Sequence, residues 1–159
     1  MLLALQRPPF LLVSARSLFR TAREPRMYKG DIKPKEAFER LEAHPNAVVL
    51  DVRTPPEWIY VGVPAIVRLV RVPWQTFPDM NVNPRFVEMV KQAGVTPENE
   101  VLCLCRSGAR SALAAQALSA AGFENCYNIA EGFEGARDNQ GHRGTIGGWK
   151  AAGLPWTQD

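Results

Sequence analysis

The sequence predicts an α/β domain whose central sheet is mainly parallel and is flanked by helices. Short, wholly apolar runs at residues 47–50 and 101–104 are typical of strands buried on both faces. Amphipathic or alanine-rich segments lie between the apolar runs, and strands that alternate with helices favour parallel pairing. Because ligands bind beyond the carboxyl ends of parallel strands, functional side chains are expected where these runs end.

The amino-terminal half begins with a predicted short helix at residues 34–43, where a proline occupies the first turn and apolar residues share one face. The apolar run 47–50 is the first predicted strand. The sequence Thr-Pro-Pro-Glu at residues 54–57 then favours a capped helix start. Residues 65–72 are rich in β-branched side chains and are predicted as a second strand.

The carboxyl-terminal half continues this alternation. Residues 83–94 begin with Asn-Pro and end near a glycine, which predicts a helix, and the run 101–104 is the third strand. The alanine-rich residues 111–121 form a predicted helix that is closed by a following glycine. The remaining predicted segments are, in order, the strand 126–129, the glycine-rich loop 131–148 and the short helix 149–152.

Residues 1–26 differ in composition from the rest of the chain, and we exclude them from the fold. They hold five arginines but a single acidic residue, Glu24, and are rich in leucine and serine. This composition is typical of an organelle transit peptide; the alternatives are a disordered tail or an upstream start codon, with Met27 as the working start. A transit peptide implies a mitochondrial or plastid destination in a eukaryote, whereas a bacterial chain is expected in the cytoplasm. The domain itself is predicted at residues 27–159.

Charge and hydropathy argue against nucleic-acid and membrane partners. The chain of 159 residues carries a formal net charge of +3. Residues 1–26, here called the leader, account for this charge, since residues 27–159 hold 14 basic and 15 acidic side chains. No basic face for a nucleic acid is therefore indicated. No apolar run reaches the roughly 18–20 residues that a membrane-spanning helix needs.

The chain contains three cysteines, Cys103, Cys105 and Cys126, too few for a disulfide framework and enough to leave a working thiol. There is no Cys-x-x-Cys pair, and the two histidines, His44 and His142, lie far from the cysteines in the sequence. We therefore expect no metal site and no cofactor.

The strongest chemical signal is the segment Cys105-Arg106-Ser107-Gly108-Ala109-Arg110-Ser111, which follows a buried strand and runs directly into a helix. A thiol at such a junction lies beneath backbone N–H groups that form an anion-binding nest, and the helix dipole adds positive potential. Arg106 and Arg110 add full charges, so all three effects favour a nucleophilic thiolate at Cys105. Gly108 permits a backbone conformation that other residues resist. We predict Cys105 as the catalytic residue and residues 106–111 as an anion-binding loop.

The other two cysteines have a simpler explanation. Free cysteine commonly behaves as a small buried apolar residue, and we interpret Cys103 and Cys126 in this way. For Cys105 the structural explanation is weaker, because a cysteine, two arginines and a glycine at one strand-to-helix junction make a specific combination.

The Cys105 segment resembles the active-site loop of the rhodanese-domain sulfurtransferases. Residues 50–58 (LDVRTPPEW) are similar to a strand-end signature of that family, and residues 147–156 (GGWKAAGLPW) are similar to its closing segment. The resemblance covers about residues 28–157, nearly all of the chain outside the leader. It implies a rhodanese-like three-layer domain with a mainly parallel central sheet flanked by helices.

The resemblance also implies a persulfide mechanism. The Cys105 thiolate takes sulfur from a small anionic donor such as thiosulfate, holds it as Cys–S–S⁻, and passes it to an acceptor such as cyanide, a thiol or a protein thiol. The loop and its arginines would stabilise the persulfide anion. Asp51 and Arg53 are carried over as supporting residues, and a purely structural ion pair explains them at least as well.

Two stretches set this sequence apart within the family. Residues 61–64 (VGVP) replace the Gly-His-Ile segment of many members, which affects local packing rather than the expected chemistry. The glycine-rich residues 141–144 are similar to a stretch found in a subgroup of single-domain rhodaneses. Its His142 and Arg143 either border the active site or belong to a solvated surface loop, and we favour the surface loop.

Two other functions fit parts of the sequence. A cysteine-dependent phosphatase or arsenate reductase uses a similar loop, but its usual Cys-x5-Arg spacing is one residue longer than that between Cys105 and Arg110. The shorter ring of N–H groups suits one sulfur atom better than a phosphate. A low-turnover persulfide carrier or a binding and regulatory rhodanese module is the nearer alternative, although such modules often lack the cysteine.

Overall fold

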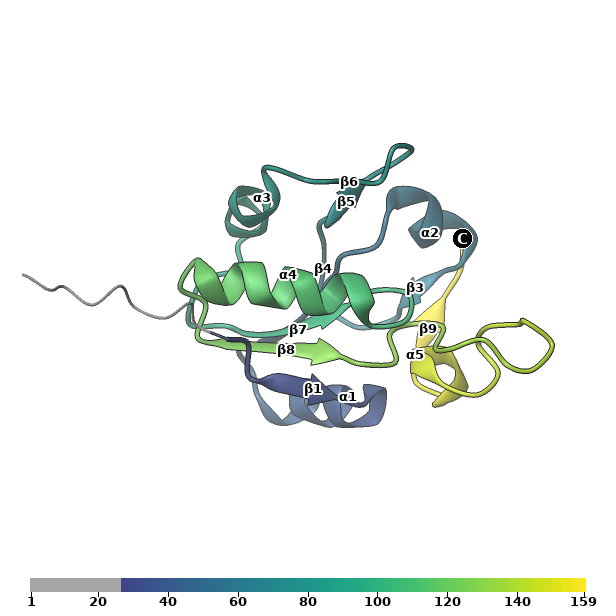
Figure 1. The fold of residues 1–159 in the computed structure, drawn as a ribbon. Helices are drawn as coiled ribbons and strands as arrows, with labels where there is room; N and C mark the ends of the chain where they lie inside the picture. The colour runs from purple at the N-terminus through teal and green to yellow at the C-terminus, as the bar shows by residue number, and fades with distance from the viewer. Residues whose placement is uncertain (1–26) are drawn as a thin grey trace, which may run out of the picture.

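The computed structural model describes residues 27–159, so the predicted leader at 1–26 lies outside the described residues. The main feature is a five-stranded parallel sheet in the order β1-β8-β7-β2-β4 (Figure 1). Its strands are β1 (Gly30–Ile32), β2 (Ala47–Asp51), β4 (Leu69–Arg71), β7 (Glu100–Leu104) and β8 (Asn125–Ile129). The predicted α/β class with a mainly parallel sheet is confirmed.

Helices cover both faces of this sheet and give the molecule three layers (Figure 1). On one face lie α3 (Phe86–Gln92) and α4 (Ala109–Ala120), and on the other lie α1 (Pro34–Ala43) and α5 (Gly148–Ala151). α2 (Pro55–Tyr60) follows β2 beyond the carboxyl ends of the strands. None of the helices between residues 27 and 159 is long and apolar enough to cross a membrane.

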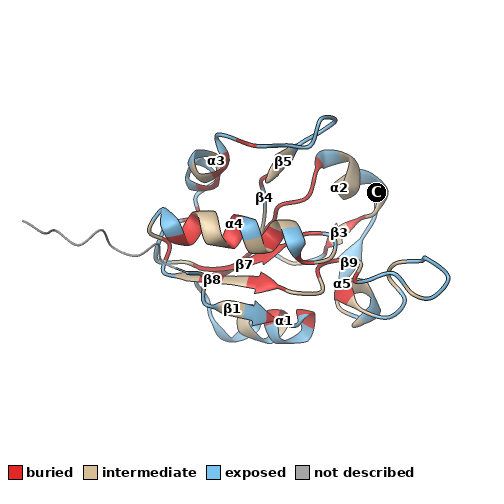
Figure 2. Ribbon diagram, in the orientation of Figure 1, coloured by how far each residue is buried: buried red, intermediate tan, exposed pale blue. Residues whose placement is uncertain are grey.

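Strand β7 shows why the runs at residues 47–50 and 101–104 are wholly apolar. Successive side chains of a strand point to opposite faces. Val101 and Cys103 therefore pack beneath α3 and α4, whereas Leu102 and Leu104 pack against α1 and α5. All four side chains are fully buried, and Figure 2 shows buried residues along β7, at the carboxyl end of β8 and at intervals along α4. The apolar run thus contributes side chains to the hydrophobic clusters on both faces of the sheet.

Most of the predicted elements are confirmed with small shifts at their ends. α1 occupies the predicted residues 34–43, and α5 lies one residue before its predicted place. α4 begins at Ala109, two residues earlier than predicted, because the left-handed backbone of Gly108 turns the chain directly into the helix. The predicted helix at 83–94 is shorter, since regular helix is confined to α3.

The prediction of one strand at residues 65–72 is wrong in extent. Only β4 belongs to the main sheet. Just before this stretch, β3 (Val63–Pro64) pairs antiparallel with β9 (Trp156–Thr157), and Ala65 N–H donates to the carbonyl of Pro155 at 3.0 Å. The β-branched residues between β3 and β4 therefore connect two separate sheets.

A short hairpin was not predicted from the sequence. β5 (Gln75–Thr76) pairs antiparallel with β6 (Asn81–Val82), and the hairpin stands beside α2 at the top of Figure 1. Each strand contains two residues, too few for a periodic pattern to show. Strand β1, with three residues, was missed for the same reason.

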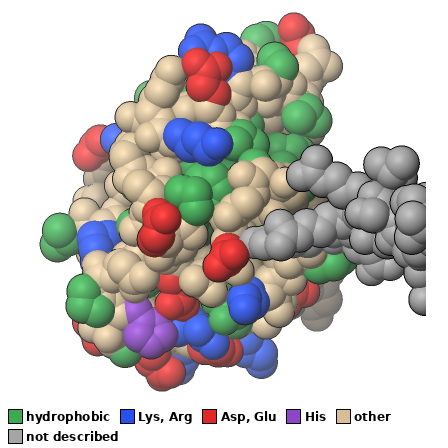
Figure 3. Space-filling view, turned by 90° about the vertical axis from the view of Figure 1, so that its left-hand side faces the viewer, with side chains coloured by type: hydrophobic (Ala, Val, Ile, Leu, Met, Phe, Trp, Pro, Cys, Tyr) green, Lys and Arg blue, Asp and Glu red, His purple; other side chains and the backbone are tan. Residues whose placement is uncertain are grey.

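The face at the amino ends of the strands carries paired charges. Figure 3 shows acidic and basic side chains close together there, next to a histidine. Arg40 and Glu100 form an ion pair at 3.1 Å, and His44 Nδ1 lies 2.6 Å from the same carboxylate. This surface lies at the opposite end of the sheet from the Cys105 loop.

The two-sided core gives a matched test of packing on one helix. Leu118 of α4 is fully buried, so Leu118→Ala should lower the free energy of unfolding by about 2–5 kcal/mol, because it leaves a cavity. Leu113 is 59% exposed on the same helix, and Leu113→Ala should change that free energy by less than about 0.5 kcal/mol. Urea unfolding followed by circular dichroism measures both variants. Equal losses would contradict the packing of α4.

Candidate active site

The Cys105 loop connects β7 to α4 at the carboxyl ends of the strands. Cys105 follows the last residue of β7, and α4 begins at Ala109. Gly108 turns the chain with a φ of 106°, a left-handed conformation that favours glycine. A Cβ atom at Gly108 would also lie 1.9 Å from the carbonyl oxygen of Ala130. Both the conformation and the space therefore require glycine here, and the predicted strand-to-helix junction is confirmed.

The segment after β8 holds this loop in place. Phe133 N–H donates to the carbonyl oxygen of Cys105 at 2.8 Å, and Glu134 N–H donates to that of Arg106 at 2.9 Å. Gly132 allows this approach, since a Cβ atom there would lie 2.5 Å from the Cys105 oxygen. The carbonyl groups at the start of the loop are thus turned towards residues 132–134.

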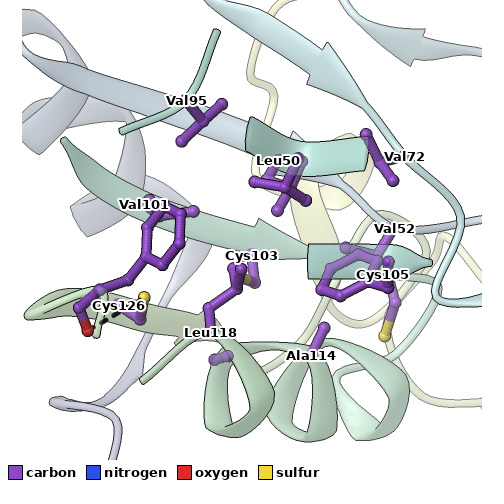
Figure 4. Packing of buried hydrophobic residues seen from close by; sticks show 14 residues of the cluster. Leu50, Val52, Val72, Val95, Val101, Cys103, Cys105, Ala114, Leu118 and Cys126 are labelled. Carbon is purple, nitrogen blue, oxygen red and sulfur yellow. Dashed lines mark hydrogen bonds between the residues drawn. The ribbon is translucent and has the colours of Figure 1, made fainter. Parts of the chain in front are cut away.

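The sulfur of Cys105 lies inside the loop, and the residue is 1% exposed. Gly108 N–H donates a hydrogen bond to Sγ at 3.1 Å, and the Ser111 hydroxyl oxygen lies 3.1 Å from the same atom. Figure 4 shows the sulfur directed towards the first turn of α4, a helix of 12 residues. The backbone donor and the positive end of the helix dipole both stabilise negative charge at this position.

Arg110 is engaged by a carboxylate. Its Nη1 and Nη2 donate to the two oxygens of Glu57 at 2.9 and 2.6 Å. Thr54 donates to Glu57 Oε2 through its N–H and its hydroxyl, at 2.9 and 2.8 Å. Burial raises the pKa of Glu57, but the donors from Arg110 and Thr54 outweigh burial and lower that pKa from 4.5 to about 2. Hydrogen bonding to Glu57 raises the pKa of Arg110. The pair is therefore charged and mutually neutralised at neutral pH.

This pairing gives the two loop arginines, which the sequence predicts to have the same role, different surroundings. Arg110 has its fork occupied by Glu57, whereas Arg106 is exposed and forms no ion pair within residues 27–159. Glu57 was not among the predicted site residues. Its place three residues after Thr54, as in a capping box, was a signal for that hydrogen bond and gave no sign of Arg110.

Asp51 and Arg53 form a buried ion pair beneath the site. Both side chains are 0% exposed, and Arg53 Nη2 lies 2.6 Å from Asp51 Oδ2. The same nitrogen donates to the carbonyl of Gly62 at 2.8 Å, and the guanidinium stacks 4.3 Å from the centre of the Phe133 ring. Neither side chain lines the pocket. The pair joins the end of β2 to the segment that holds the Cys105 loop. This arrangement fits the interpretation of Asp51 and Arg53 as a structural ion pair.

A pocket of about 590 Å³ opens over the loop. The predicted loop residues that line it are Cys105, Arg106, Ser107, Ala109 and Arg110. Gly108 and Ser111 lie on the inner side of the loop, where they contact the sulfur instead.

The other walls of the pocket come from distant segments. Phe77 and Met80 of the β5–β6 hairpin, 60% and 37% exposed, form an apolar wall. Glu134 and Arg143 form a polar wall, where Arg143 Nη1 donates to the carbonyl of Gly135 at 2.7 Å. His142 does not line the pocket. The glycine-rich stretch is thus divided, since Arg143 borders the site and His142 lies in the surface loop.

The two remaining cysteines are buried in the core (Figure 4). Burial raises the pKa of the Cys103 thiol well above its usual value and that of Cys126 to about 11. Their interpretation as structural residues is confirmed. Within residues 27–159, no three histidine, cysteine, aspartate or glutamate side chains are grouped so that they could hold a metal ion.

One polar residue at the site was missed in the sequence. Asn128 of β8 is 3% exposed, and its Oδ1 lies 2.6 Å from the Ser111 hydroxyl oxygen. Its Nδ2 donates to Asp31 Oδ1 on β1 at 3.0 Å. An asparagine inside an otherwise buried strand was a signal, because buried polar groups require partners.

Comparisons with known sequences place the chain among rhodanese-like domains. A family described as the STR4 middle domain matches residues 30–159. An uncharacterised protein of Rickettsia conorii is 36% identical over 124 residues, which cover 76% of this chain and 91% of the relative. The chloroplastic rhodanese-like domain-containing protein 4 of Arabidopsis thaliana is 30% identical over 125 residues, which cover 78% of this chain and 25% of that longer protein.

Solved structures give the same fold. The crystal structure of Rv0390 from M. tuberculosis matches with a TM-score of 0.76 and 42% identity, covering 83% of this chain and 99% of that one. The polysulfide-sulfur transferase homodimer of Wolinella succinogenes matches with a TM-score of 0.57 and 25% identity, covering 84% of this chain and 80% of that one.

The Glu57–Arg110 pair should give stability a specific pH dependence. Because the pKa of Glu57 is lowered on folding, the pair stabilises the fold above pH 4.5 and loses this contribution as the pH falls from 4.5 to about 2. Glu57→Gln removes the titrating group, so its free energy of unfolding should fall less steeply over this window. Urea unfolding at several pH values measures the slopes.

The control is Glu88→Gln on α3, which removes the carboxylate from an exposed ion pair with Arg85. Exposed pairs contribute little, so its pH dependence should stay close to that of the wild type. Parallel pH profiles for Glu57→Gln and the wild type would contradict the assigned role of Glu57.

Proposed function

The chain belongs to the rhodanese-like family of sulfur-transfer proteins, and from this premise we propose that Cys105 carries sulfur as a persulfide between an anionic donor and a thiophilic acceptor. The observation that carries the proposal is the Cys105 sulfur, which accepts a hydrogen bond from the Gly108 N–H at 3.1 Å under a helix N-terminus, in a residue that lines a pocket with charged walls. The relative from W. succinogenes is named a polysulfide-sulfur transferase, which supports the same chemistry.

Loading of the enzyme is a displacement at sulfur. With thiosulfate as donor, the Cys105 thiolate attacks the outer sulfur, a new S–S bond forms, and the old S–S bond breaks with its electron pair leaving on sulfite. The product is Cys–S–S⁻, so the total charge is unchanged. The helix N-terminus and the loop stabilise the negative charge on both sides of this step.

Transfer of the sulfur to an acceptor is a second displacement at the outer sulfur of the persulfide. An acceptor such as cyanide or a thiolate attacks the outer sulfur, and the electron pair of the breaking S–S bond returns to Cys105 as the thiolate. Thiocyanate or the acceptor persulfide leaves the pocket. No oxidant or reductant is consumed, because sulfur moves as a neutral atom between two nucleophiles.

The arginines have different parts in this proposal. Arg106 has no carboxylate partner among residues 27–159 and stands at the pocket wall, so it attracts and orients an anionic donor. Arg110 is held by Glu57 and fixes the first turn of α4 beneath the pocket floor. The Arg110 pairing also disfavours a phosphatase, in which the loop arginine must be free to grip the oxyanion.

The first experiment is loading with a sulfur donor. Incubation of the wild type with thiosulfate should add one sulfur atom, about 32 Da by intact mass spectrometry, since a persulfide retains one extra sulfur. Cys105→Ser should remain unmodified because the nucleophile is absent. Cys126→Ala keeps Cys105 and serves as the matched cysteine control, so it should still load. Failure of the wild type to load, or loading of Cys105→Ser, would overturn the proposal.

The second experiment tests the donor charge. Arg106→Gln should lower kcat/KM for thiosulfate about five- to tenfold, because a charge-assisted contact worth roughly 1–1.4 kcal/mol is lost. The control Arg85→Gln removes an exposed arginine just before α3, away from the pocket, and should leave kcat/KM close to the wild-type value. Raised salt should reduce the wild-type rate more than that of Arg106→Gln. An unchanged kcat/KM for Arg106→Gln would remove this residue from donor binding.

A further inference from the structure

A buried chain of hydrogen-bonding groups leads away from the Cys105 sulfur into the sheet. Ser111 Oγ lies 3.1 Å from the sulfur and 2.6 Å from Asn128 Oδ1. Asn128 Nδ2 lies 3.0 Å from Asp31 Oδ1, and the same carboxylate oxygen accepts from the Tyr28 hydroxyl at 3.1 Å. Ser111 and Asn128 are 0% and 3% exposed, whereas Asp31 reaches the surface.

The direction of each hydrogen bond follows from the chemistry of the groups. An ionised carboxylate only accepts, so the Asn128 amide must present its NH₂ group to Asp31 and its carbonyl oxygen to Ser111. A carbonyl oxygen also only accepts. The short contact between Ser111 and Asn128 is therefore made by the single hydroxyl proton of Ser111.

That single proton has three acceptors within reach. They are Asn128 Oδ1 at 2.6 Å, the Cys105 sulfur at 3.1 Å and the Gly108 carbonyl oxygen at 3.2 Å. When Cys105 is a thiol, its S–H donates to Ser111 Oγ and the Ser111 proton goes to Asn128, so every group is satisfied. When Cys105 is a thiolate, the sulfur and Asn128 compete for one proton, so one buried acceptor is left without a hydrogen bond from Ser111, which is unfavourable.

We propose that Asn128 is a positioning residue that holds the Ser111 proton away from the Cys105 sulfur and thereby destabilises the free thiolate relative to the thiol and the persulfide. In the persulfide the charge resides on the outer sulfur, in the pocket, and the inner sulfur is neutral. Ser111 then donates to Asn128 without competition. The persulfide part of this inference rests on the proposed function, while the thiolate part rests on the geometry alone.

The consequence is a sulfur-loaded resting state. A free thiolate that lacks its hydrogen bond from Ser111 is both higher in energy and a better nucleophile, because nucleophilicity rises as the charge on sulfur is less stabilised. Sulfur exchange with a donor therefore shifts towards Cys–S–S⁻. Asp31 strengthens the effect, since a hydrogen bond from the amide to a carboxylate polarises the carbonyl oxygen that faces Ser111.

Charged and titratable groups surround Cys105 on several elements, and they are the same in the wild type and in an Asn128 variant. Of the described residues, the partners of Ser111 Oγ are Cys105, Gly108 and Asn128, so the variant acts through Ser111. The charged and titratable neighbours are Cys103 on β7, Arg106 on the loop, Arg110 on α4, Asp51 at the end of β2, Arg53 just after β2, Glu57 on α2, Glu134 and Arg143 across the pocket, and Asp31 and Tyr28 beyond Asn128.

The test uses Asn128→Leu, which keeps the size of the side chain and removes the acceptor. The Ser111 proton is then free to serve the charged sulfur, so the pH profile of thiolate absorbance should shift to lower pH by about 0.5–1 unit. At a fixed ratio of thiosulfate to sulfite, and at a pH where Cys105 is ionised, the ratio of persulfide to thiolate should fall about three- to tenfold.

A double-mutant cycle separates positioning from a structural effect. In the Ser111→Ala background no proton is available, so adding Asn128→Leu should not move the profile further. Asp31→Ala is a second route, since the exposed residue is easily replaced and the released amide can rotate its NH₂ group towards Ser111. It should shift the profile in the same direction as Asn128→Leu and by a smaller amount. If Asn128→Leu does not fold, Asp31→Ala takes its place in the cycle with Ser111→Ala.

The outcomes distinguish this inference from the proposed function. An unchanged or upward-shifted profile in both Asn128→Leu and Asp31→Ala, or an equal shift in the Ser111→Ala background, overturns the role of Asn128. The profile is recorded without any sulfur donor. A wild type that fails to load sulfur overturns the proposed function and the persulfide part, while the profile still decides the effect of Asn128 on the thiolate.

Discussion

The candidate site depends on two backbone hydrogen bonds that fasten the Cys105 loop to the segment after β8. Phe133 and Glu134 donate to the carbonyl oxygens of Cys105 and Arg106 at 2.8 and 2.9 Å. The same segment is held by the last helix, because Trp149 N–H donates to the carbonyl of Gly132 at 2.9 Å. The closing part of the chain thus supports the loop without touching the sulfur. Glycines are required where these backbones meet, since a side chain at Gly132 would collide with the loop.

Some charged side chains of the site are paired with one another, and others have no such partner among residues 27–159. Asp51 and Arg53 neutralise each other beneath the loop, fully buried, and a buried charge of this kind is tolerated only with its partner. Glu57 and Arg110 also neutralise each other, at the pocket wall. Arg106 lines the pocket and has no carboxylate partner within residues 27–159. Phe77 and Met80 line the same pocket from the hairpin and give it an apolar wall.

Elements with strong local signals could be predicted from the sequence. The helix at residues 34–43 follows from its proline in the first turn and its apolar face, and the buried strands β2 and β7 follow from their apolar runs. The strands β3, β5, β6 and β9, each of two residues, carry no such signal, because they form only when a partner is brought beside them. The misjudged stretch 65–72 has the same origin. Its composition favours a strand, whereas pairing partners exist for only part of it.

The sequence by itself determined the position of the Cys105 loop and predicted its chemistry, because a cysteine, a glycine and two arginines at a strand-to-helix junction are local features. It also determined that the sheet is buried on both faces. Only the tertiary structure decided that Arg110 is the loop arginine paired with a carboxylate, since its partner Glu57 lies 53 residues away on α2. It likewise placed Asn128 against Ser111, because parallel strands bring β8 beside β7 at the sulfur. Contacts between distant segments depend on the packed geometry, and no local pattern encodes them.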